Sequence, residues 1–232
     1  MNRLTVSLLL CLASGVVAAG PQLVLPGESF HGDEVPARDG ERWLALVVAG
    51  GKARLQPVAL QVTAVNDPVL DGPDDRTGRS VAAPGVDARV FLRGMAALKP
   101  GDVAVAVADT VALTVGEPQQ LHLGATTWHL TSTCADAGAE RGVECTITLD
   151  GGGASQTLFT TYGVRQEDGR LGFGDAVPSL LFAGDLDRDG RVDLLLDTTD
   201  HYNLSRPTLY LSSAAKPGQS VAEVAQQQIT GC

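Results

Sequence analysis

The chain has 232 residues, with 17 basic and 27 acidic side chains, which gives a formal net charge of −10. The sequence pI near 4.7 argues against a nucleic-acid-binding protein, because there is no excess of Lys and Arg to replace the counterions of a phosphate backbone. A hydrophobic content of 44% with 19% charged residues argues against intrinsic disorder. The length allows one large domain or two small ones, each with a buried core.

The first 19 residues have the features of a cleaved signal peptide. Arg3 is followed by an apolar stretch over residues 4–17, and small residues, Val17 and Ala19, stand three and one positions before the expected cleavage. An N-terminal core strand or helix and a lipoprotein modified at Cys11 are the alternatives. No later run approaches the ~20 apolar residues of a membrane-spanning helix. We expect a periplasmic or secreted mature chain, residues 20–232, without a transmembrane segment.

Three cysteines remain after cleavage: Cys134, Cys145 and Cys232. The first two flank a polar, Gly-containing segment between two strand-like runs, which predicts a β-hairpin with a disulfide near its tip. An oxidising compartment favours this pairing. Cys232 is then free or paired between chains, or it is the true partner of one of the other two.

The mature chain predicts an all-β fold, an antiparallel sandwich or irregular barrel with little helix. Short runs rich in Val, Leu and Thr recur between turns formed by Gly, Pro, Asp and Asn. The predicted strands are residues 43–48, 58–65, 88–92, 103–107, 119–123, 126–133, 144–149, 157–161, 180–183, 192–196, 208–211 and 221–229. Only residues 221–228, VAEVAQQQ, offer a short helix as an alternative.

Domain boundaries are weakly marked in the sequence. Residues 67–85 are rich in Pro, Gly and Asp and are expected to be a long insertion between strands. Within this region, residues 66–75 lack a regular ligand spacing, and we expect a solvated loop there. One continuous β domain over residues 20–232 is favoured over a subdivision near residue 115.

The most specific motif is GDLDRDGRVDLLLD, residues 184–197, which contains the pattern D-x-D-x-D-G-x-x-D. Its alternating carboxylates direct hard oxygen ligands at one centre, and Gly190 permits the sharp turn. Oxygen ligands select Ca²⁺ ahead of Mg²⁺ or Mn²⁺. The flanking runs are strand-like and position 12 is Leu196, so the motif predicts a calcium loop between two strands and not an EF-hand. The expected ligands are Asp185, Asp187, Asp189, the backbone carbonyl of Arg191, and Asp193.

This segment resembles the calcium loops of the FG-GAP/VCBS repeat family. The matching residues are Phe182, Gly184, Asp185, Asp187, Asp189, Gly190, Asp193 and the apolar residues 194–196. The resemblance covers about 30 residues within residues 173–213, and it implies that the four Asp side chains bind Ca²⁺ in a β-hairpin loop. The motif occurs once, whereas a propeller needs at least four blades. The resemblance therefore implies a calcium loop and not a complete propeller.

Other candidate functional residues are weaker. Asp200, His201 and Tyr202 follow the loop closely in sequence and could line a ligand site with it, or they belong to a polar turn. His122 and His129 lie in strand-like runs, and no nucleophile-elbow, P-loop, Rossmann or zincin motif is present. We expect a non-enzymatic, exported protein with one structural Ca²⁺. The alternative is a metal-assisted hydrolase or a carbohydrate-binding protein that uses Asp200, His201 and Tyr202; a protein ligand is also open.

Overall fold

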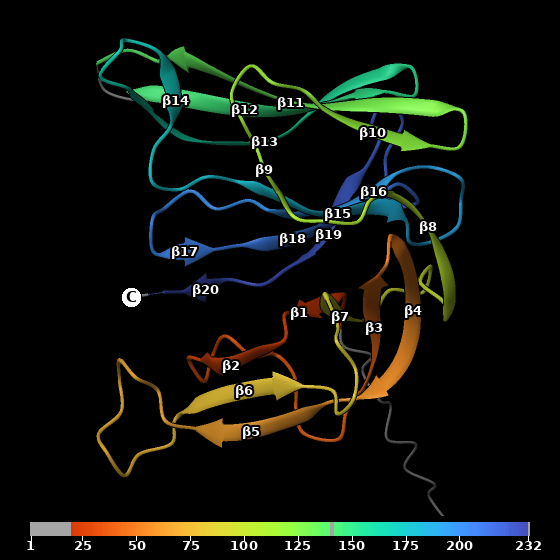
Figure 1. Ribbon diagram of the computed structural model, residues 1–232, viewed down its shortest axis with the longest axis vertical. Helices are drawn as coiled ribbons and strands as arrows, with labels where there is room; N and C mark the ends of the chain where they lie inside the picture. The colour runs from red at the N-terminus through yellow and green to blue at the C-terminus, as the bar shows by residue number, and fades with distance from the viewer. Residues whose placement is uncertain (1–19, 140–141, 232) are drawn as a thin grey trace, which may run out of the picture.

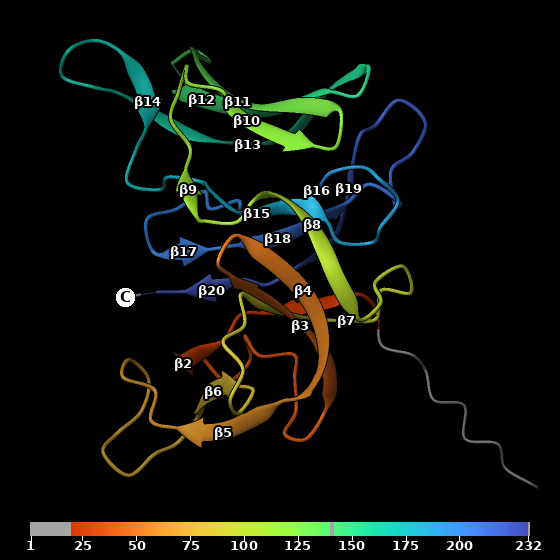
Figure 2. The same ribbon diagram turned by 45° about the vertical axis from the view of Figure 1, so that its right-hand side comes forward.

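The computed structural model describes residues 20–139 and 142–231. All regular elements in these ranges are β-strands, and all their pairings are antiparallel, so the predicted all-β class is confirmed. The strands form a barrel-like sheet and three further sheets (Figures 1 and 2). No helix long and apolar enough to cross a membrane occurs among the described residues.

The largest element is a ten-stranded sheet that curves into a nearly closed barrel. Its two end strands contact each other, and the backbone N–H of Leu25 donates to Oε1 of Gln227 across this seam, at 2.8 Å. In order across the sheet, the strands are β1 (Gln22–Val24), β7 (Val90–Arg93), β3 (Arg42–Ala49), β4 (Lys52–Ala59), β8 (Gly101–Val107), β15 (Ser179–Asp185), β16 (Asp193–Asp197), β18 (Pro207–Leu211) and β19 (Ala222–Gln226), with β9 (Val111–Ala112) paired to β15.

A five-stranded sheet lies over the β15–β16–β18 side of the barrel, at the top of Figures 1 and 2. Its strands, in order, are β10 (Gln119–Leu123), β11 (Thr126–Asp136), β12 (Val143–Gly151), β13 (Ala154–Arg165) and β14 (Leu171–Phe173). Residues alternate along β11: Trp128 and Leu130 are buried against the barrel, whereas Thr127 is exposed. This alternation orients the whole sheet on the barrel.

Two small sheets complete the fold. The three-stranded sheet contains β2 (Gly27–Phe30), β6 (Gly78–Ala82) and β5 (Gln61–Val65), and the two-stranded sheet contains β17 (Leu204–Ser205) and β20 (Ile229–Thr230). Phe30, Leu60 and Val81 form a core with Trp43 and Phe91 of the barrel. The three-stranded sheet thus covers the side of the barrel opposite the five-stranded sheet (Figure 1).

β16 is buried on both faces, and this explains its continuous apolar sequence. Leu194 and Leu196 pack toward the five-stranded sheet, whereas Leu195 between them packs inside the barrel. All three side chains have no exposed surface. The loop that precedes β16 is therefore anchored to the best-packed part of the molecule.

The predicted strands coincide with observed ones, with three corrections. Residues 58–65 belong to two strands, β4 and β5, because the buried Leu60 lies at a turn between sheets. Residues 67–85 are not one loop, since β6 pairs there with β5 and β2. The predicted strand over residues 221–229 is two strands, because Ala222–Gln226 pairs with β18 whereas Ile229–Thr230 pairs with β17 in another sheet, and the helical alternative for residues 221–228 does not occur. Residue 115 lies between β9 and β10, where the chain passes from the barrel to the five-stranded sheet.

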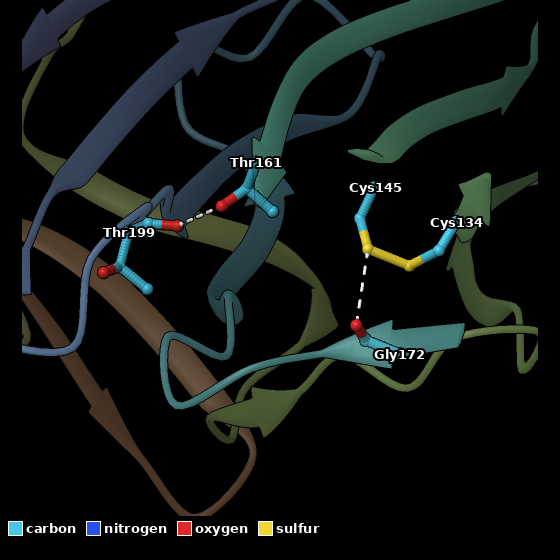
Figure 3. The surroundings of a disulfide bond; sticks show 5 residues. All are labelled: Cys134, Cys145, Thr161, Gly172 and Thr199. Atoms are coloured by element: carbon cyan, nitrogen blue, oxygen red, sulfur yellow. Dashed lines mark hydrogen bonds between the residues drawn. A yellow bond between two sulfur atoms is a disulfide. The ribbon is translucent and has the colours of Figure 1, made fainter. Parts of the chain in front are cut away.

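The predicted disulfide is confirmed. Cys134 and Cys145 are directly paired in the register of β11 and β12 and are joined by a disulfide (Figure 3). Cys145 is fully buried, and its Sγ lies 3.8 Å from the carbonyl oxygen of Gly172 on β14. The predicted signal peptide, Cys11 and Cys232 lie outside the described residues.

Candidate metal centre

The predicted calcium loop connects β15 to β16, so its position between two strands is confirmed. Gly184 pairs with Asp193 at the base of this hairpin. A Cβ atom at Gly184 would lie 2.5 Å from the backbone oxygen of Ala104 on β8, so only glycine permits this close approach. The hairpin thus holds Asp185 and Asp193 side by side where the two strands separate.

Three loop carboxylates converge on one point. Asp185, Asp187 and Asp193 each offer an oxygen, and these oxygens all lie within 4.8 Å of one another. Asp193 is completely buried and Asp185 is 9% exposed. None of the three forms an ion pair with a basic side chain of the described residues. Such a group of hard oxygen donors can hold a metal ion.

Backbone N–H groups fix the orientation of Asp193. Its Oδ2 accepts hydrogen bonds from Leu186 at 2.7 Å and Asp187 at 3.2 Å. Its Oδ1 accepts a bond from the N–H of Ser212, just after β18, at 2.7 Å. Because these bonds leave only part of each oxygen's acceptor capacity free, the carboxylate is held in a single orientation at the base of the loop.

Asp185 closes the turn of the loop. Its two oxygens accept hydrogen bonds of 3.0 Å from the N–H groups of Asp189 and Gly190. Gly190 has a φ of 83°, which confirms the turn that the motif predicts at this glycine. Arg188 also has a positive φ, 63°, and its guanidinium donates to the carbonyl oxygens of Lys99, just before β8, and of Asp102 in β8. The tip of the loop is thereby tied to the barrel.

Asp189 does not belong to the converging group. Its Oδ2 accepts hydrogen bonds from Nε and Nη2 of Arg191, at 2.9 and 2.8 Å, and its Oδ1 accepts one from the hydroxyl of Ser212 at 2.9 Å. The motif predicts four Asp ligands, of which the structure brings three together and pairs the fourth with Arg191. The ligand role of the Arg191 carbonyl stays a prediction.

The surroundings shift the pKa values of Asp193 and Asp189 in opposite directions. Burial, together with the nearby charge of Asp187, raises the pKa of Asp193 to about 7, although the hydrogen bonds from Ser212 and Leu186 oppose the shift. Burial also acts to raise the pKa of Asp189, but the hydrogen bonds from Arg191 outweigh it and leave that pKa below its usual value. A cation between the carboxylates would favour the charged form of Asp193, so binding and ionisation are coupled there.

Asp200, His201 and Tyr202 lie at the opposite end of β16 from the loop, so the structure does not bring them together with the loop carboxylates. Five residues of extended strand separate the two ends, a span of about 13–16 Å. Both terminal nitrogens of Arg206 donate hydrogen bonds to the carboxylate of Asp200, at 3.0 and 3.1 Å. Tyr202 is 72% exposed. This segment is a polar turn, held by local hydrogen bonds.

Sequence reasoning missed Ser212 and Ser213. The N–H of Ser213 donates to Oδ2 of Asp187 at 3.3 Å, so both serines contact the loop carboxylates. Nothing in the sequence signals this, because these donors follow the loop by about 20 residues and reach it only through the pairing of β16 with β18.

Residues 66–75 form a loop outside the strands that is mostly exposed, as expected, with one buried carboxylate. Asp67 is 1% exposed, and its Oδ2 lies 2.5 Å from Nδ1 of His31. Its Oδ1 accepts hydrogen bonds from the N–H groups of Val69 and Leu70. This carboxylate organises the turn and connects it to the segment after β2.

Comparisons with family models, curated proteins and solved structures found no match to this chain. The similarity of the loop to FG-GAP/VCBS repeats therefore remains a prediction from residues 182–196.

Proposed function

We propose that this protein is an exported calcium-binding β-protein of non-enzymatic type, in which Ca²⁺ stabilises the loop between β15 and β16. The observation that carries the proposal is the convergence of Asp185, Asp187 and Asp193 without a basic partner among the described residues. Like charges at such short separation repel one another, and a divalent cation between them removes this repulsion. The spacing of the motif and its resemblance to FG-GAP/VCBS loops favour calcium among the hard cations.

The ligand set also supports a structural role. Asp185 and Asp193 belong to strands buried in the core, so the ion would connect the ends of two strands and the intervening loop. At about 1 mM calcium and a Kd of about 10⁻⁴ M, binding to the folded state alone adds about 1.4 kcal/mol to the free energy of unfolding. For a chain of this length, that corresponds to an increase of about 3–5 °C in Tm.

The test is thermal unfolding of the mature chain with about 1 mM calcium and with excess chelator. Calcium should raise Tm, and the variant Asp187→Ala/Asp189→Ala should unfold at the same temperature in both conditions. Asp74→Ala/Asp87→Ala removes two exposed carboxylates elsewhere and serves as the charge-matched control, which should keep the calcium response. Identical melting of the unmodified chain with and without chelator would refute the proposal.

Export is part of the proposal and has its own support. The N-terminal 19 residues have the composition of a signal peptide. The disulfide between Cys134 and Cys145 is typical of proteins in oxidising compartments. Cleavage after Ala19 should give a periplasmic or secreted chain that starts at Gly20, and intact-mass measurement of the exported protein checks this directly.

A further inference from the structure

A pocket of about 280 Å³ lies between the proposed calcium loop and the five-stranded sheet. One wall consists of Gly190, Arg191 and Val192 from the loop, and the facing wall includes Trp128 on β11 and Gly152 in the turn between β12 and β13. The loop therefore contributes to two sites. Its carboxylates form the candidate metal centre, and its second half lines the pocket.

Trp128 places an indole N–H at the edge of the pocket. The residue is only 4% exposed, but its Nε1 is not among the fully buried polar atoms that lack a partner, and no hydrogen bond from it to another described residue is present, so the nitrogen borders the open space of the pocket. The other tryptophan, Trp43, donates its indole N–H to Glu41. A Cβ atom on Gly152 would lie 3.2 Å from Nε1 of Trp128, so the glycine leaves this nitrogen uncovered. An acceptor on a ligand in the pocket would satisfy it.

The pocket has no acidic lining residue, although the protein is acidic overall. The formal net charge of the chain is −10, but no Asp or Glu side chain lines this cavity, and its one charged lining residue is Arg191, which is paired with Asp189. Thr126, Gln219 and Ser220 add hydroxyl and amide groups, and Val192 adds an apolar surface. Hydrogen-bond donors with a guanidinium beside an apolar wall match a carboxylate on a short organic body.

We propose that this pocket binds a small organic carboxylate, whose oxygens accept hydrogen bonds from the indole N–H of Trp128 and from Arg191, and that calcium in the neighbouring loop strengthens this binding. The carboxylate part of the proposal depends only on the pocket. The coupling rests on the calcium site proposed above.

Arg191 provides the connection between the two sites. Its Nε and Nη2 bind Asp189, and Nη2 also donates to the carbonyl oxygen of Ser212 at 2.6 Å. Asp189 is the one carboxylate of the motif outside the converging group. A cation that recruits Asp189 leaves the guanidinium with one anionic partner fewer, and its charge becomes available to a ligand in the pocket. By thermodynamic reciprocity, the carboxylate should strengthen calcium binding by the same factor.

The experiment follows the indole N–H of Trp128 by ¹H–¹⁵N NMR during titration with sodium benzoate at constant ionic strength. The variant Trp43→Phe assigns the indole resonances, and benzamide serves as the uncharged comparator. Benzoate should shift the Trp128 resonance saturably and leave that of Trp43 in place. In Arg191→Gln its affinity should fall about tenfold, which is the effect of one hydrogen bond to a charged group. Arg165→Gln removes an exposed arginine on β13 and should leave the affinity unchanged.

The outcomes separate the two proposals. No saturable shift at millimolar benzoate, or equal affinities for benzoate and benzamide in the unmodified protein, overturns the carboxylate site whatever calcium does to Tm. Repetition with saturating calcium should raise the benzoate affinity about fivefold. A calcium-dependent Tm with an unchanged benzoate affinity overturns the coupling alone. If neither Tm nor benzoate affinity responds to calcium, the calcium site and the coupling fail together, and the carboxylate site stands.

Discussion

The backbone N–H of Ser212 donates a hydrogen bond of 2.7 Å to Oδ1 of Asp193, across 19 residues of sequence. It joins the base of the candidate metal loop to the segment after β18, and it is possible because β16 and β18 pair antiparallel with Leu194 opposite Tyr210. The orientation of a predicted ligand therefore depends on a strand that the motif does not contain.

This relationship predicts the effect of Asp193→Asn without calcium. An Asn side chain can accept through only one of its two polar atoms, so the N–H of Ser212 or those of Leu186 and Asp187 lose their acceptor. We expect a loss of about 1–3 kcal/mol in the free energy of unfolding, because a buried donor is left unsatisfied. Urea unfolding in the presence of chelator measures it. The same change at the exposed Asp87 should have no effect, and an equally small change at both positions would contradict the argument.

The loop carboxylates should contribute unequally to calcium affinity. Asp187 belongs to the converging group, whereas Asp189 must first give up its hydrogen bonds with Arg191 and Ser212. We expect Asp187→Asn to raise the calcium Kd about tenfold or more, and Asp189→Asn to raise it by a smaller factor. Isothermal titration calorimetry provides both values. Equal losses would show that the pairing of Asp189 with Arg191 does not persist in solution.

The disulfide should stabilise the fold by restricting the unfolded chain. Closure of the loop between Cys134 and Cys145 corresponds to about 2.5–3 kcal/mol on the chain-entropy estimate. Urea unfolding with and without a reductant should show this difference, and the double variant Cys134→Ala/Cys145→Ala should be insensitive to the reductant. Equal stability of the oxidised and reduced chains would contradict the prediction.

The contact between His31 and Asp67 predicts a pH dependence of stability. The hydrogen bond to Asp67 raises the pKa of His31 from its usual 6.5, and the same bond lowers the pKa of Asp67 from 3.8. A raised histidine pKa contributes stability that is complete below 6.5 and lost as the pH rises through the folded-state pKa. The lowered pKa of Asp67 contributes stability that is complete above 3.8 and lost as the pH falls through the folded-state value.

Thermal unfolding between about pH 5.5 and 8.5 tests the histidine side of this pair. Tm should decrease across this range more steeply in the unmodified chain than in His31→Asn, which removes the titrating group. His122→Asn replaces an exposed histidine and should follow the unmodified chain. Parallel curves for all three proteins would show that the contact with Asp67 does not stabilise the fold.

The sequence by itself determined the all-β class, most strand positions, the pairing of Cys134 with Cys145 and the place of the acidic loop between two strands. These features are local: strand alternation, turn residues and the spacing of a motif all operate within about 15 residues. The sequence did not predict the short strands β1, β2, β6, β9, β14 and β17, because each of them is defined by its pairing with a partner strand.

Only the tertiary structure decided which acidic residues converge. The pattern D-x-D-x-D-G-x-x-D does not show which of its Asp side chains converge. In the structure, Arg191 and Ser212 hold Asp189 away from the group. Strand β16 separates Asp200 and His201 from the group. The net charge of −10 likewise does not show where acidic side chains are absent. Packing of the loop against β11 produces a pocket that no carboxylate lines. The direction of a side chain depends on which donors and strands pack beside it, and those neighbours come from distant parts of the chain.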